Sequence, residues 1–118
     1  MNSFEDMGLS PEIVGALDDL GFKKPFPIQE RVIPILWSGC DVIGQAHTGS
    51  GKTAAFGLPI LEIIDEKNPV VQALIVVPTR ELAVQVAREI NSYAKNTYKR
   101  ALALYGGESI YVQLDAMR

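Results

Sequence analysis

Residues 46–53, Ala-His-Thr-Gly-Ser-Gly-Lys-Thr, combine small, flexible and hydroxyl-bearing residues with one lysine. The glycines let the backbone curl so that several N–H groups face one point, and the helix predicted to follow favours an anion at its N-terminus. Lys52 would then reach the β- and γ-phosphates of a ligand, and the Thr53 hydroxyl would hold Mg²⁺. The general pattern G-x-x-x-x-G-K-[ST] departs here only at its first position, where Ala46 replaces glycine. A glycine-rich turn with a surface lysine is the simpler interpretation, but the strand-like residues before the loop favour a phosphate site.

A second group of residues with the chemistry of a binding site lies at 21–29, Gly-Phe-Lys-Lys-Pro-Phe-Pro-Ile-Gln. Gln29 carries both a donor and an acceptor, the pair needed to bind the N6/N7 edge of adenine. Phe22 offers a face on which a base could stack. Taken alone, the stretch reads more simply as a proline-rich turn whose aromatic side chains fill the core.

The third group is Pro-Thr-Arg-Glu-Leu-Ala at 78–83. Thr79 can cap a helix and Glu81 favours the start of one, so every residue has a structural use. Alternatively, Thr79, Arg80 and the free N–H groups of the helix start could contact a phosphate backbone.

The elements that would position these groups alternate between helix and strand. Amphipathic spacing predicts helices at 11–20, 28–38, 52–64 and 109–118, and apolar runs predict strands at 42–46, 70–77 and 101–105. A further helix is predicted after Thr79, in which Leu82, Val86 and Ile90 recur every four residues. The run at 70–77 is apolar except for Gln72, which is typical of a strand buried on both faces of a parallel sheet. The order predicts an α/β fold built from right-handed β-α-β units.

Length, composition and charge limit the classes of protein to which this chain can belong. The chain has 118 residues, 47% of them hydrophobic, a net charge of −3 and one cysteine, Cys40. These values predict one ordered domain in a reducing compartment, without a zinc cluster or an intrachain disulfide. The charge argues against a generally basic nucleic-acid binder, so any RNA contact must be local. No apolar run is long enough for a membrane span and no signal peptide is visible, so we expect a cytoplasmic location and no membrane partner.

Together the three stretches resemble the DEAD-box ATP-dependent RNA helicases. Residues 21–29 match that family's Q motif, G-F-x-x-P-x-x-I-Q, and Phe4 stands where the family has an isolated upstream aromatic. Residues 46–53 match its motif I, including the alanine that departs from the general pattern, and 78–83 match its motif Ia. Gly106 and Gly107 fall at the family's GG motif.

The resemblance implies a role for each matching position. ATP and Mg²⁺ are the expected cofactors; Gln29 would read adenine, Phe22 would stack on it and Phe4 would support that pocket. The residues expected at the phosphates and Mg²⁺ are Thr48, Gly49, Ser50, Gly51, Lys52 and Thr53.

RNA is the expected partner, through its sugar-phosphate backbone and without sequence specificity. Its expected contacts are Thr79, Arg80, Gly106 and Gly107. Two residues depart from the family: His47 replaces the usual glutamine and is not expected to be catalytic, and Phe26 replaces a threonine or serine that could cap the helix carrying Gln29.

By the same resemblance, residues 1–118 would form the N-terminal portion of the first RecA-like domain, a P-loop parallel sheet with flanking helices that is incomplete. The Asp-Glu-Ala-Asp (Walker B) motif and the second domain are absent from these residues. Lys52 and Thr53 would therefore be catalytic only in the parent enzyme, and the isolated chain is predicted to be inactive. Strands 42–46 and 70–77 would not be sheet neighbours, and such unpaired edges invite pairing with another chain. An ordered form of these residues is therefore expected either to complete its sheet by self-association or to be part of a longer parent. Two alternatives stay open: a nucleotide-binding module without enzymatic activity, and a non-catalytic RNA-contacting fragment.

Overall fold

The computed structural model describes residues 3–47, 51–107 and 109–117, which fold into one short 3₁₀ helix and a set of α-helices. The predicted helices are confirmed, with ends within about two residues of those expected. Their bounds are η1, Glu5–Met7; α1, Pro11–Asp19; α2, Pro27–Trp37; α3, Lys52–Ile63; α4, Arg80–Tyr93; and α5, Ile110–Ala116.

Helix α1 shows why local sequence sets these ends. Pro11 occupies the first helical position, where its missing N–H costs no hydrogen bond. At the other end Gly21 adopts a φ of +86°, its N–H bonds the carbonyl of Asp18, and the N–H of Phe22 bonds that of Leu17. This is a Schellman stop, and it directs the chain into the stretch that carries Gln29.

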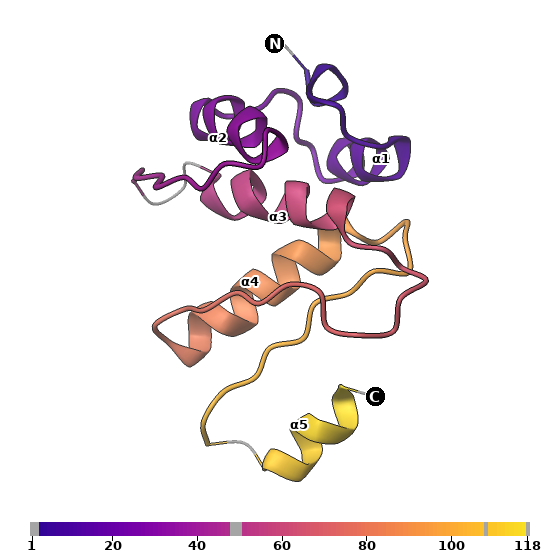
Figure 1. Ribbon diagram of the computed structural model, residues 1–118, viewed down its shortest axis with the longest axis vertical. Helices are drawn as coiled ribbons and strands as arrows, with labels where there is room; N and C mark the ends of the chain where they lie inside the picture. The colour runs from indigo at the N-terminus through magenta and orange to yellow at the C-terminus, as the bar shows by residue number, and fades with distance from the viewer. Residues whose placement is uncertain (1–2, 48–50, 108, 118) are drawn as a thin grey trace.

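Helix α3 lies between α2 and α4, and α1 packs against α4 (Figure 1). The apolar faces of these helices meet in one core, to which the N-terminal segment contributes Phe4, Met7 and Leu9. The contact between α3 and α4 is close: a Cβ on Gly57 would lie 3.2 Å from Ile90 Cγ1. The remaining buried members of the core are Ile13, Leu17, Ile33, Ala54, Leu58, Leu61, Val86, Ile90, Tyr93 and Ala94.

The predicted parallel sheet is the main expectation that the structure does not bear out. Residues 3–47, 51–107 and 109–117 contain no β-strand, so the segments 42–46, 70–77 and 101–105 do not form the predicted strands. A strand exists only where two extended segments lie about 4.8 Å apart and exchange backbone hydrogen bonds. Here residues 74–78 and 101–106 instead line a cavity of about 450 Å³, so neither segment serves as the partner of the other.

Helix α5 lies at the opposite end of the molecule from the N-terminus, away from the α1–α4 core (Figure 1). None of its residues is buried, and Ile110, Tyr111 and Val112 are all more than half exposed. Within the part of the chain that the structure describes, no helix is long and apolar enough to cross a membrane.

Candidate nucleotide and RNA sites

Gln29 lies in the first turn of α2 and is fully buried, the only polar residue in the described part of the chain to be so. Its side-chain carbonyl accepts a hydrogen bond from the N–H of Phe26 at 3.0 Å, and its amide nitrogen donates to the carbonyl of Gly51 at 3.1 Å. The first bond is the half of a capping box that the third helical residue supplies, while the phenylalanine ring at position 26 has no acceptor for the other half. The second joins the candidate adenine-reading residue directly to the candidate phosphate loop.

Gly51 sits at this junction in a conformation that requires glycine. Its φ is +85°, and a Cβ there would lie 2.4 Å from Gln29 Nε2 and 2.5 Å from Phe26 Cδ2. Both distances are far inside van der Waals contact, so the absent side chain is what lets Phe26 and Gln29 approach the loop. A backbone that a Cβ would block is also what close approach of a phosphate needs.

Lys52 and Thr53 form the first turn of α3, with Lys52 exposed and Thr53 half-buried. The Lys52 ammonium donates to the carbonyl of Ala46 at 2.7 Å, so the lysine spans the loop from its last residues to its first. The predicted ligands Thr48, Gly49 and Ser50 lie outside the described residues. His47 is exposed, and its lack of a catalytic role stays a prediction from the sequence.

The two aromatic residues expected at the nucleotide lie at different depths. Phe22 is half-buried and meets the ring of Tyr93 edge to face, with centroids 6.0 Å apart and planes at 77°. Phe4 is only 4% exposed and packs inside the core, so in this arrangement it cannot touch a ligand and can act only by supporting its neighbours.

Tyr93 is a residue that the sequence analysis missed. Burial, together with the negative charge of Glu89 one turn earlier, raises the pKa of its phenol to about 12. A signal was available, because Tyr93 continues the apolar spacing of Val86 and Ile90 along α4.

The residues expected at RNA are brought together at the start of α4. The Thr79 hydroxyl accepts from the N–H of Leu82 at 3.1 Å and caps the helix, as predicted. Arg80 extends over the glycine pair: a Cβ on Gly107, whose φ is +87°, would lie 3.0 Å from Arg80 Nη1. Gly106 precedes it in the same exposed turn.

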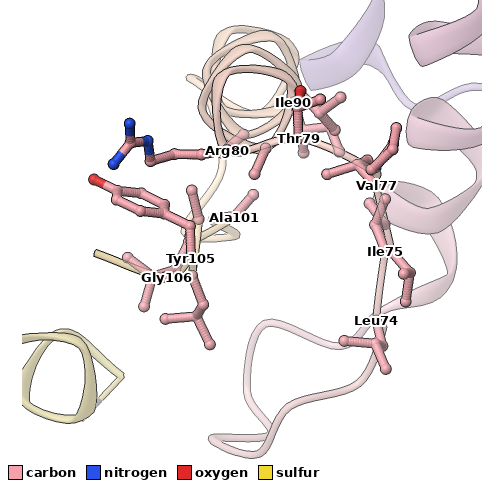
Figure 2. Close-up of a pocket in the computed structure, with 17 residues that line it drawn as sticks. Leu74, Ile75, Val77, Thr79, Arg80, Ile90, Ala101, Tyr105 and Gly106 are labelled. Atoms are coloured by element: carbon pink, nitrogen blue, oxygen red, sulfur yellow. The ribbon is translucent and has the colours of Figure 1, made fainter. Parts of the chain in front are cut away.

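Tyr105 adds a side chain that the sequence analysis did not single out. Figure 2 shows its ring beside the Arg80 guanidinium, both directed away from Leu74 and Ile75. Arg80, Glu81, Val84, Tyr105 and Gly107 line a surface hollow of about 480 Å³. A guanidinium, an aromatic ring and a glycine turn on one surface are the groups that contact single-stranded nucleic acid backbones and bases. The Arg80–Glu81 ion pair, at 3.9 Å and exposed, is too weak to hold the arginine away from such a ligand.

Comparison with known proteins identifies the family. The family model described as DEAD/DEAH box helicase matches residues 26–118, and this chain belongs to that family. A curated relative, the DEAD-box ATP-dependent RNA helicase CshA of Geobacillus kaustophilus, is 48% identical over 118 residues. The match covers 100% of this chain but 25% of the relative, so the chain spans about a quarter of that protein's length.

Solved structures share the arrangement of the chain. A DEAD box protein from Methanococcus jannaschii matches with a TM-score of 0.88 and 41% identity, covering 100% of this chain and 32% of the other. Dbp5 of S. cerevisiae, in a structure bound to RNA and ADP BeF₃, matches with a TM-score of 0.81 and 32% identity, over 93% of this chain and 30% of the other.

Proposed function

We propose that this chain is the ATP-binding and RNA-contacting N-terminal segment, residues 1–118, of an ATP-dependent RNA helicase. The parent would couple ATP hydrolysis to the unwinding of RNA duplexes or the remodelling of RNA–protein complexes. The observation that carries the proposal is the direct contact between Gln29 and Gly51, because it joins a base-reading amide to a phosphate-binding backbone. Membership of the DEAD/DEAH box family supports the same reading.

The residues present fit an adenine nucleotide. In the structure both hydrogen-bonding groups of Gln29 are used internally, and they are the same donor and acceptor that adenine N7 and N6 would need. Since Gln29 is fully buried, binding would have to expose its amide and exchange the bond to the Gly51 carbonyl for a bond to the base. Phe22 would stack against the base from one side, with Phe4 supporting it from the core.

The phosphate end is built from the loop and the first turn of α3. Lys52 would release the carbonyl of Ala46 and place its charge on the outer phosphates, while the helix N-terminus supplies backbone N–H groups. Thr53 would hold Mg²⁺, with Thr48, Gly49 and Ser50 completing the loop. A metal there would neutralise the charge that develops on the transferred phosphoryl group.

The RNA end is the surface around Arg80. Thr79, Arg80, Gly106 and Gly107 would contact the sugar-phosphate backbone, which reads strand geometry and not sequence. Dbp5, the solved relative bound to RNA and ADP BeF₃, supports a site of this kind in the family.

The isolated 118-residue chain is expected to be inactive in ATP hydrolysis. Its sequence contains no Asp-Glu-Ala-Asp motif, and phosphoryl transfer needs a metal-holding carboxylate and a group that orients water. We place the parent in the cytoplasm, in keeping with the single free cysteine, Cys40. Fractionation of cells that produce the parent tests that location.

RNA-stimulated ATP hydrolysis by the parent polypeptide tests the proposed function. We expect Lys52→Ala to abolish hydrolysis, and Lys67→Ala, which removes an exposed lysine from the loop after α3, to leave it unchanged. Hydrolysis that RNA does not stimulate would contradict the helicase assignment and favour a simple nucleotide-binding module. RNA binding that persists in Lys52→Ala without any ATPase activity in the wild type would favour a non-catalytic RNA-contacting fragment.

A further inference from the structure

Phe22, the residue proposed to stack on the base, lies in the turn between α1 and α2 and not in a helix. Its N–H donates to the carbonyl of Leu17 at 2.9 Å, so its backbone is fixed to the last turn of α1. That bond does not fix the ring, because the side-chain torsions of a phenylalanine can adopt several rotamers on one backbone. The orientation of the ring must therefore be set by what the ring touches.

The Phe22 ring is in contact with Tyr93, the last residue of α4. The two ring centroids lie 6.0 Å apart and the ring planes meet at 77°, an edge-to-face arrangement. Tyr93 is 4% exposed and belongs to the core, whereas Phe22 is half-buried and packs against that core from outside. Tyr93 is thus the member of the pair whose position the core fixes.

An edge-to-face contact leaves Phe22 a surface on which a base can stack. If the edge of Phe22 meets the face of Tyr93, both faces of Phe22 remain clear of Tyr93. If the edge of Tyr93 meets Phe22, one face remains clear. The contact between the rings can therefore persist while a base stacks on Phe22, unlike the bond from Gln29 to Gly51, which binding would exchange.

Two polar contacts join α1 to the end of α4 beside this pair of rings. Lys95 Nζ lies 2.7 Å from Asp19 Oδ2, and Asn96 Nδ2 donates to the carbonyl of Glu12 at 3.2 Å. Both donors lie just past the end of α4, and both acceptors belong to α1. The helix that fixes the backbone of one ring is thereby joined to the helix that carries the other.

We infer that Tyr93 is a positioning residue for ATP binding, whose ring holds the Phe22 ring in the orientation that stacks on adenine. The inference rests on the proposed function, since it requires Phe22 to stack on a base. Without the ring of Tyr93, Phe22 samples other rotamers in the free protein and loses that freedom when the base binds, which lowers the affinity. Tyr93 does not touch the nucleotide, so the chemical step does not depend on it.

Isothermal titration calorimetry of the parent polypeptide tests the inference with ATP and with inorganic triphosphate, which has the phosphates but no base. Tyr93→Leu keeps an apolar side chain and removes the ring. It should raise the Kd for ATP roughly 2- to 12-fold, the equivalent of ordering one side chain. It should leave the Kd for inorganic triphosphate unchanged, because that ligand does not meet Phe22. Tyr93→Phe retains the ring and should bind ATP as the wild type does, and kcat at saturating ATP should be the same in all three proteins.

Val86→Ala is the matched control for a purely structural effect. Val86 is 7% exposed in the same core and lies about two turns before Tyr93 on α4. Its truncation should lower the free energy of unfolding and leave both Kd values unchanged.

Three results would overturn the inference: an unchanged Kd for ATP in Tyr93→Leu, an equal rise for ATP and inorganic triphosphate, or the same rise for ATP in Val86→Ala. If the wild type binds ATP, each of these results leaves the proposed function standing. A wild type that binds no ATP would contradict the inference and the proposed function together.

Discussion

Gly51 is the residue on which the candidate nucleotide site depends most closely. It combines a left-handed φ with two side chains packed where its Cβ would be, and the second feature sets it apart from other glycines of similar φ. Gly21 has a φ of +86° with nothing within 4 Å of the position that a Cβ would occupy, so it shares the backbone conformation without the crowding.

Substituting the two glycines separates these effects. Gly21→Ala should lower the free energy of unfolding by roughly 1–2 kcal/mol through backbone strain alone. Gly51→Ala should cost about 1–3 kcal/mol more, because Phe26 and Gln29 must also move away. Urea unfolding followed by circular dichroism measures the free energy of unfolding of both variants. Equal losses would show that the crowding around Gly51 does not contribute to stability.

Tyr93 gives the fold a dependence on alkaline pH. Its folded-state pKa of about 12 lies above the usual 10.0, so between these values the folded chain holds a proton that the unfolded chain has lost. Stability is therefore full below pH 10 and falls as the pH rises towards 12.

Tyr93→Phe isolates this contribution, since it keeps a ring against Phe22 and removes the titrating group. We expect the free energy of unfolding to fall more steeply with pH in the wild type than in Tyr93→Phe over this range. If the free energy of unfolding fell equally with pH in the two proteins, the raised pKa of Tyr93 would be contradicted.

At the scale of the elements, helix α4 carries the candidate RNA-contacting surface and is capped by Thr79. Thr79→Ala should cost about 1 kcal/mol of stability, because it leaves the N–H of Leu82 without its acceptor. Ser10 occupies the same position before α1 but makes no side-chain cap bond, so Ser10→Ala should cost much less. Thermal unfolding of the two variants makes the comparison, and equal losses would mean that the Thr79 cap contributes nothing specific.

The helices were predictable from sequence because their hydrogen bonds are local. Pro11, Gly21 and Thr79 act on residues three to five positions away, and the apolar spacing along the chain selects the buried face. Strand formation could not be predicted in the same way, because a segment such as 70–77 becomes a strand only when a partner segment pairs with it, and no local pattern shows whether that partner is present.

Contacts between distant residues in the site were equally beyond local patterns. Gln29 and Gly51 were each predicted as ligand-binding residues, but the bond between them joins positions 22 residues apart. Tyr105 was missed because its importance comes from lying beside Arg80, which only the folded chain shows.

On the scale of the whole molecule, the helices α1–α4 bury their apolar faces in one core. The segments predicted as strands are not paired with one another and contribute little to that core. The core buries the apolar faces of the helices and the N-terminal segment, and it leaves Leu74 and Val76 in solvent. The helical layer thus carries the candidate nucleotide and RNA sites, while the segments predicted as strands remain unpaired with one another.

The most direct test of the account is base selectivity in the parent polypeptide. ATP should bind more tightly than GTP by about 5- to 150-fold, the equivalent of roughly 1–3 kcal/mol for a bidentate amide–adenine contact. Gln29→Glu keeps the acceptor for the N–H of Phe26 but loses the donor, and it should abolish most of this preference. Gln85→Ala, on the exposed side of α4, should preserve it.

Isothermal titration calorimetry with ATP and GTP measures this preference in the wild type and in both variants. The account predicts selectivity for ATP that is lost only in Gln29→Glu. Equal affinity for ATP and GTP in the wild type, or an unchanged preference in Gln29→Glu, would contradict it.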